Sequence, residues 1–219
     1  MALVDVMGWL ATVITISIGL PQFIRLLRTR DASGIAIIYW QISFGTVACW
    51  LAHGVVIGQL PMIICNAGTE LIGVFVCVML IRTRGVPVWK MFLPGLGILA
   101  VMVTMDLVFG SLWFGIPVAC LQCFSNAGQS VDLVRSPQVT GVSVLVLVLQ
   151  NLNQVVWAWW AILLEDPGTI LVCVATEVVV GFNLVWRLLR LGGLRAFRPY
   201  PPPAPRVGET ARLGEGSIG

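Results

Sequence analysis

Seven long apolar runs, separated by short polar clusters, make up most of the chain. Each run holds about 20 residues or more, enough for a helix to cross a hydrocarbon layer of roughly 30 Å. Lipid offers the backbone no hydrogen-bond partners, so helices are the form expected for such runs. The first run lacks a basic leader and a small-residue cleavage site, which indicates a span rather than a removed signal peptide. The predicted spans are 4–27, 36–58, 61–81, 89–109, 111–134, 141–163 and 167–189.

Composition and charge sharpen this picture. Hydrophobic residues make up 58% of the 219 positions and charged residues 11%, against about 25% charged residues in a typical soluble domain. These values exclude a soluble domain and predict a protein embedded in the lipid bilayer. All 13 lysines and arginines lie beside the loops after spans one, three and five or after span seven. The positive-inside rule then predicts an outer amino terminus and a cytoplasmic carboxyl terminus, and we expect the plasma membrane.

The chain contains an internal repeat at an offset of 107 residues. Matches between scarce polar or aromatic residues indicate a duplication more strongly than apolar matches do. These matches pair Gly8 with Gly115, Gln22 with Gln129, Arg28 with Arg135, Trp50 with Trp157, Thr69 with Thr176 and Glu70 with Glu177. The predicted organisation is a three-helix repeat over 1–84, a linker helix over 85–110, a second repeat over 111–190 and a disordered cytoplasmic tail over 191–219.

A three-helix unit ends on the opposite side of the membrane from its start, so a parallel second copy requires one extra crossing. The fold class predicted is therefore an all-α membrane protein of two parallel three-helix bundles plus a linker helix. Parallel repeats place a binding site between the halves near mid-membrane. The two repeats already complete a pathway, so a homo-oligomer is allowed but not required.

Polar side chains recur at helical spacing within several spans, so each set shares one face. The sets are Gln150, Asn153, Gln154, Trp157 and Trp160 in span six, Ser43, Thr46, Trp50 and His53 in span two, Gln122, Ser125, Asn126 and Gln129 in span five, Asn66, Thr69 and Glu70 in span three, and Cys173, Thr176 and Glu177 in span seven. Amides and hydroxyls beside indole rings suit a small polar solute with an apolar face, such as a sugar. The alternative is that these groups only hold helices together.

Three ionisable residues within spans allow two interpretations each. Glu70 and Glu177 lie near mid-depth, where a carboxylate is costly to bury. They are either proton-coupling groups or protonated donors to a neighbouring helix. His53, beside Trp50, is either a ring in the wall of the site or a proton relay.

The residues around the first loop resemble the PQ-loop of the SWEET and SemiSWEET sugar transporters. The resemblance rests on Gly19-Leu20-Pro21-Gln22, the segment from Arg28 to Ile35, the stretch Cys49-Trp50-Leu51-Ala52-His53-Gly54, and Asn66. It implies that Trp50 and Asn66 contact the substrate and that Pro21, next to Gln22, is a flexing point. Through the repeat, Trp157 and Cys173 take the matching site positions, and Gly128 with Gln129 the matching hinge.

Several residues depart from the family pattern, and they leave the substrate open. Gly128 stands where the first repeat has Pro21, Cys173 replaces a second asparagine, and His53 replaces a tyrosine. A passive, bidirectional carrier of small sugars is the leading hypothesis. A proton-coupled carrier of an amino acid or other small metabolite, and a non-transporting receptor, are the alternatives.

Enzymatic chemistry is not indicated. The sequence has no recognisable nucleophile–base set and no phosphate loop. Its one CxxC, Cys120 with Cys123, lacks a second ligand pair for a metal. We therefore expect no catalytic residue, metal or cofactor, and no nucleic-acid partner.

Overall fold

A computed structural model describes residues 2–29, 37–139 and 141–198 of the chain. These residues form seven helices that agree with the predicted spans to within a few residues at each end. The helices are α1 (Leu3–Thr29), α2 (Ile37–Val56), α3 (Leu60–Arg84), α4 (Val88–Phe109), α5 (Ser111–Arg135), α6 (Val144–Leu163) and α7 (Pro167–Leu191). Most of the predicted disordered tail lies outside the described residues.

Local signals fix several helix ends. Helix α3 has a proline, Pro61, in its first turn, where a missing N–H costs no hydrogen bond. It ends at Gly85, whose φ of 65° is a left-handed conformation that glycine adopts without strain. Helix α7 likewise begins with Pro167, directly after Asp166. Asp166 therefore lies directly before the first turn of α7, at its N-cap position.

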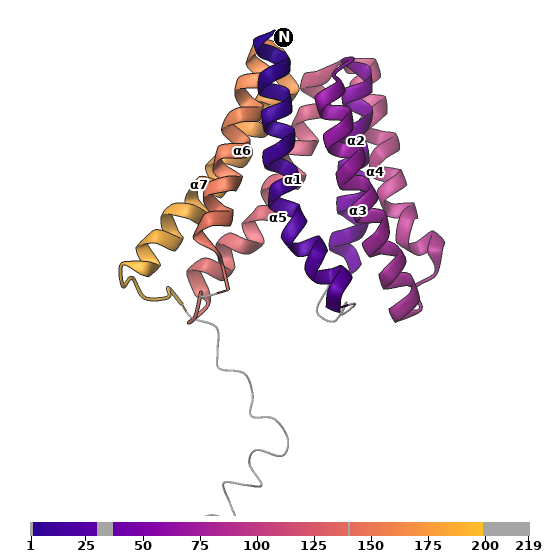
Figure 1. The fold of residues 1–219 in the computed structure, drawn as a ribbon. Helices are drawn as coiled ribbons and strands as arrows, with labels where there is room; N and C mark the ends of the chain where they lie inside the picture. Colours follow the sequence, from indigo (N-terminus) through magenta and orange to yellow (C-terminus); the bar gives the residue numbers. More distant parts are fainter. Residues whose placement is uncertain (1, 30–36, 140, 199–219) are drawn as a thin grey trace, which may run out of the picture.

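The seven helices form two three-helix units, and α4 lies alongside α2 of the first unit, on the right in Figure 1. Helices α1 to α3 make the first unit and α5 to α7 the second, while α4 packs against α2 on one side and α5 on the other. Helix α1 also packs against α6 and so joins the two halves directly. This arrangement confirms the predicted all-α architecture of two bundles and a linker helix.

The two halves converge at one end of the molecule and diverge at the other (Figure 1). The convergent end holds the start of α1 and the turns that join α2 to α3, α4 to α5 and α6 to α7, and is called the N-terminal end here. The opposite end holds the ends of α1, α3, α5 and α7. A bend in the lower part of α1 carries it toward the first half at this divergent end (Figure 1).

Within the described part of the chain, five of the helices are long and apolar enough to cross a membrane. Helices α2 and α5 fall short of that hydropathy because they carry many polar side chains. In α2 these include Gln41, Thr46 and His53, and in α5 they include Gln122 and Asn126. A polar residue inside a membrane is tolerated when it faces protein or a wet cavity. The polar faces of these two helices should therefore point to the interior of this integral membrane protein.

Glycines allow the closest helix crossings. A methyl group at Gly45 of α2 would lie 2.6 Å from the carbonyl oxygen of Gly95 in α4. A methyl group at Gly115 of α5 would lie 2.6 Å from the Cα of Gly168 in α7. Small residues at such crossings let helix backbones approach closely in a membrane, where dispersion contacts drive association. These crossings fix α4 against the first half and α5 against α7.

Candidate functional site

A cavity of about 750 Å³ lies between the two halves. Helices α1, α2 and α3 contribute to one part of its wall and α5, α6 and α7 to the other. Its polar lining consists of Thr15, Tyr39, Ser43, Thr46, Asn66, Thr69, Gln122, Ser125, Asn126, Asn153, Gln154 and Thr169. Trp50, Trp157 and Cys173 also line it. The structure thus brings five of the six predicted substrate-binding residues into one cavity.

The wall formed by the first half carries Trp50 and Asn66. The Asn66 amide donates to the carbonyl oxygen of Met62 one turn earlier, at 2.8 Å. An asparagine amide has a second N–H and a carbonyl oxygen for other partners. The Trp50 ring packs edge-on against Phe114 of α5, with 5.3 Å between ring centroids. The indole is therefore held rigidly from the second half while it lines the cavity.

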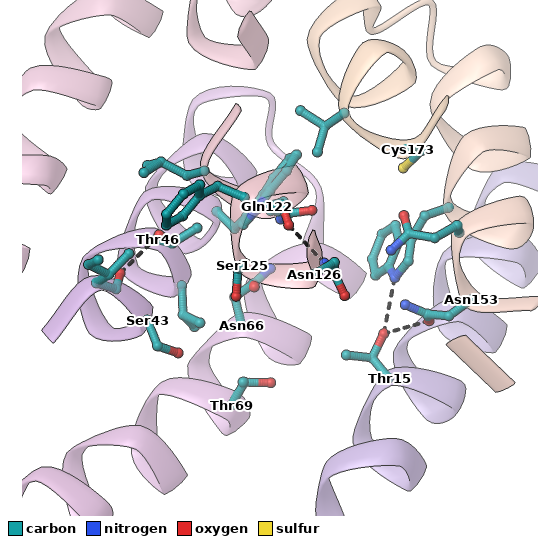
Figure 2. A pocket seen from close by; sticks show the side chains of 18 of the residues that line it. Thr15, Ser43, Thr46, Asn66, Thr69, Gln122, Ser125, Asn126, Asn153 and Cys173 are labelled. Carbon is teal, nitrogen blue, oxygen red and sulfur yellow. Dashed lines mark hydrogen bonds between the residues drawn. The ribbon is translucent and has the colours of Figure 1, made fainter. Parts of the chain in front are cut away.

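On another side of the cavity, α1 of the first unit meets α6 of the second around Thr15. Its hydroxyl donates to Asn153 Oδ1 at 2.8 Å and accepts a bond from Trp157 Nε1 at 3.1 Å. Figure 2 shows Thr15 and Asn153 meeting on one side of the cavity, with Ser43, Thr46 and Thr69 on the other. Because α1 belongs to the first unit and α6 to the second, these two bonds connect the halves inside the cavity.

The structure describes the surroundings of two of the four predicted hinge residues. Gly128 lines the cavity, and a methyl group there would meet no atom within 4 Å. Gln129 faces α7 instead, where its Oε1 lies 3.4 Å from the Nδ2 of buried Asn183. Pro21 and Gln22 lie within helix α1, but their side chains fall outside the described part of the structure.

His53 does not line the cavity, although the sequence placed it there. Its side chain is fully buried at the N-terminal end, stacked on Phe114 with 4.5 Å between ring centroids. The ring Nδ1 lies 2.7 Å from Asp106 Oδ2, and the Nε2 lies 3.0 Å from Asp166 Oδ2. Neither Asp106 nor Asp166 was among the site residues predicted from the sequence.

Asp166 lies before α7, outside the membrane-spanning helices, and is held by several donors. Burial disfavours the charged carboxylate, but hydrogen bonds from His53 and from Ser111 Oγ outweigh that cost and lower the pKa of Asp166 to about 2. The Ser111 hydroxyl in turn accepts a bond from the backbone N–H of Gly168, at 3.1 Å. The carboxylate therefore ties α2, α5 and the start of α7 together.

The two glutamates occupy different surroundings. Glu70 lines a second, smaller cavity of about 310 Å³ with Gly19, Tyr39, Trp40 and other first-unit residues. Both of its carboxyl oxygens are buried, and neither has a hydrogen-bond partner. Glu177 lies in α7 away from both cavities, and its Oε2 is likewise buried without a partner. The repeat pairs these residues, but of the two only Glu70 lines one of these two cavities.

The wall of the large cavity is largely apolar and uncharged, with polar groups from several helices set among side chains such as Ile42, Val47 and Leu121. Among the described residues that line it there are hydroxyls, amides, indoles and thiols, and no Asp, Glu, Lys, Arg or His. Such a wall can hydrogen-bond a solute in many directions without balancing a charge. The indole faces of Trp50 and Trp157 supply flat apolar surfaces. A neutral, hydroxyl-rich solute satisfies both features.

Comparison with known proteins places the chain among transporters. No family model matches it. The sugar transporter SemiSWEET of Bradyrhizobium diazoefficiens is 34% identical over 80 residues, which cover 36% of this chain and 93% of that protein. That relative is thus about as long as one three-helix unit. The structure of a eukaryotic SWEET transporter, solved at 3.7 Å, matches with a TM-score of 0.65 at 13% identity, over 88% of this chain and 100% of that chain. The structural match shows that the folds are alike.

Proposed function

Since the chain belongs to the SWEET/SemiSWEET family of sugar transporters, we propose that it carries small sugars across the membrane as a passive, bidirectional uniporter. The observation that carries this proposal is the uncharged cavity between the halves, whose apolar wall carries scattered amides, hydroxyls and two indole rings. Its amides and hydroxyls can replace the water around sugar hydroxyls, and its two tryptophans can cover the C–H faces of the ring. Trp50, Asn66, Trp157, Cys173 and Asn153 are the proposed contacts.

Alternating access supplies the proposed route. The charge bias of the sequence supports an outer N-terminal end, so the diverging end of the two halves would face the cytoplasm. The conformation described here would then be open inward and closed outward. Bending of α1 at Pro21–Gln22 and of α5 at Gly128–Gln129 would let the halves rock about the cavity. Proline weakens a helix by removing an N–H donor, and glycine bends without steric cost.

A transport screen tests the substrate class. Purified protein in liposomes would be offered radiolabelled glucose, sucrose and a panel of neutral amino acids, with equal pH on both sides. Uptake of a sugar is expected, and its loss in Asn66→Ala and Trp50→Ala would support the site. Ser17→Ala is the control, since Ser17 is exposed and bonded only to its own helix. Sugar uptake that persists undiminished in both site variants would refute these contacts.

A second candidate function is proton-coupled transport of an amino acid or another small metabolite. The observation that favours it is the Glu70 carboxyl group, whose buried oxygens lack partners beside a cavity. A carboxyl in such a place can bind and release a proton as its access to water changes. Glu177 is the repeat-related candidate.

Coupling has a distinct signature. An inward proton gradient should then drive accumulation of the substrate above equilibrium, and Glu70→Gln should abolish accumulation while leaving exchange intact. Glu177→Gln is the paired comparison, because its carboxyl lies away from both cavities. If neither the gradient nor either substitution changes the final substrate level, transport is passive and this candidate is wrong.

A further inference from the structure

His53 joins three separate parts of the molecule at the N-terminal end. The residue belongs to α2 of the first unit, Asp106 to the last turn of the linker helix α4, and Asp166 to the start of α7 in the second unit. The exposed fractions of their side chains are 0%, 4% and 5%. A buried charged group is stable only when it is paired and hydrogen-bonded. The three side chains therefore form a closed cluster, called the His53 triad here, that links the two halves.

The surroundings of the triad contain few other charges. Among the described residues, the titratable groups that act on His53 are Asp106 from α4 and Asp166 from the start of α7. Helix α5 contributes Phe114, stacked on the ring, and Ser111, which donates to the other oxygen of Asp166. Helix α3 packs near this part of α2 through the apolar residues Met62 and Ile63 beside Gly54.

The geometry determines how many protons the triad must hold. Both ring nitrogens of His53 lie within hydrogen-bond distance of a carboxylate oxygen. A neutral imidazole has one N–H and therefore can donate to only one of the two acceptors. Two good hydrogen bonds need one additional proton, either on the ring or on a carboxyl group. Loss of that proton would leave one buried carboxylate facing the lone pair of a ring nitrogen and two buried negative charges without a positive partner, which is strongly unfavourable.

We propose that the His53 triad is a proton-held latch that keeps the N-terminal end closed, so that opening of this end depends on the pH of the solution it faces. The extra proton stabilises the closed arrangement, in which the three helices meet. When the halves separate at this end, water reaches the triad and the proton passes to that solution. High pH therefore favours opening and low pH favours closure. This proposal rests on the alternating-access part of the proposed function.

The latch also accounts for the asymmetry between the repeats. The repeat position of His53 is Trp160, which is fully buried and packs edge-on against Trp157 at 5.0 Å between ring centroids. At this repeat position the first half therefore carries an ionisable ring and the second half a non-ionisable one. Because the triad holds one additional proton, the expected pH response is that of one proton.

Distance measurements between spin labels test the latch without a transport assay. Labels would be attached at Leu60→Cys on α3 and Ile162→Cys on α6, two exposed positions at the N-terminal end on opposite halves. Cys120 and Cys123 would be replaced by alanine, because the other four cysteines are buried. The protein in lipid nanodiscs would be measured by double electron–electron resonance from pH 5.5 to pH 9.

The long-distance population is expected to grow several-fold between pH 6 and pH 9 in the otherwise unchanged chain. In His53→Gln it should be large at both pH values, so the pH response is lost. Asp106→Asn keeps the size of the side chain and lets a neutral ring donate to Asp166 while accepting from the amide, so the end should stay closed at both pH values. Glu165→Gln alters an exposed carboxylate next to Asp166, and Glu70→Gln alters the buried one in the first unit. Both controls should keep the original profile.

The outcomes distinguish failure of the latch proposal from failure of the proposed alternating access. If glucose shifts the distances but neither pH nor His53→Gln does, the latch is wrong and alternating access stands. If glucose, pH and His53→Gln all leave the N-terminal end closed, both the latch and alternating access are contradicted. A pH response that persists in His53→Gln and disappears in Glu70→Gln would assign the proton to the second cavity and overturn the latch.

Discussion

Thr15 is the residue that most directly couples the cavity to the contact between the halves. Its hydroxyl lies on α1 and bonds both Asn153 and Trp157 of α6. The Asn153 amide and the Trp157 indole therefore line the cavity while their bonds to Thr15 hold α1 and α6 together. Because these groups are already oriented before a solute binds, less conformational entropy is lost on binding.

Thr15→Val tests this arrangement because it removes the hydroxyl at nearly constant volume. Asn153 and Trp157 would lose their shared partner, and sugar affinity is expected to fall about three- to tenfold, as the loss of one net hydrogen bond predicts. Equilibrium binding to the purified protein measures the change. Thr104→Val is the matched control, since Thr104 is exposed on α4 and bonds only its own helix. Equal affinities for Thr15→Val and the unchanged chain would contradict the coupling.

Asp166 predicts how stability responds to acid. Its pKa, lowered to about 2 in the folded protein, lies below the ordinary value of 3.8. A lowered carboxyl pKa stabilises the fold above the ordinary value, and this contribution disappears as pH falls from about 4 toward 2. Asp166→Asn removes that contribution, on the order of 2 kcal/mol. The difference in thermal midpoint between the two proteins should therefore be largest near neutral pH and shrink below pH 4. A difference that stays constant with pH would contradict this account.

The polar stripes of the sequence predicted most of the cavity, because residues three and four apart share a helix face. They could not predict the setting of His53. Its partners lie 53 and 113 residues away, and periodicity within one helix does not reveal which helix ends meet. Gln129 shows the same limit, since a stripe cannot distinguish a cavity-facing amide from one that bonds Asn183 of α7.

At the scale of the elements, the close crossing of α2 and α4 fixes the linker helix on the first half. The α4 glycine Gly95 lies where a side chain would meet the Gln41 carbonyl oxygen, the Gly45 backbone and the Phe44 ring. The linker is therefore a packed part of the first half, and its last turn presents Asp106 to His53. The helices themselves were predictable from hydropathy, whereas this crossing depends on which small residues face each other.

Gly95→Leu should separate α4 from α2. Overpacking of a tight contact typically costs about 1–3 kcal/mol, so a lower thermal midpoint in detergent is expected. Gly97→Leu is the control on the same helix, because a methyl group at Gly97 would meet no atom within 4 Å. If both substitutions lower the midpoint equally, the effect does not come from the crossing, because the higher helix propensity of leucine would act in the opposite direction.

At the scale of the whole molecule, duplication gives two similar halves and divergence makes them unequal. The 107-residue offset of the repeat predicted the pairing of Trp50 with Trp157, and both line the cavity. The relative orientation of the halves could not be predicted from the sequence. Their convergence at one end and divergence at the other depends on how the helices pack (Figure 1). The cavity lies between halves that are joined at one end.

Counterflow tests the central claim most directly, that this cavity passes sugar between the two sides without an energy source. Liposomes loaded with unlabelled glucose would be diluted into labelled glucose at equal pH and ionic composition. The account predicts transient accumulation of label in liposomes with the unchanged protein, and only background label with Asn66→Ala inserted to the same level. Accumulation that requires a proton gradient, or that is equal in Asn66→Ala, would contradict it.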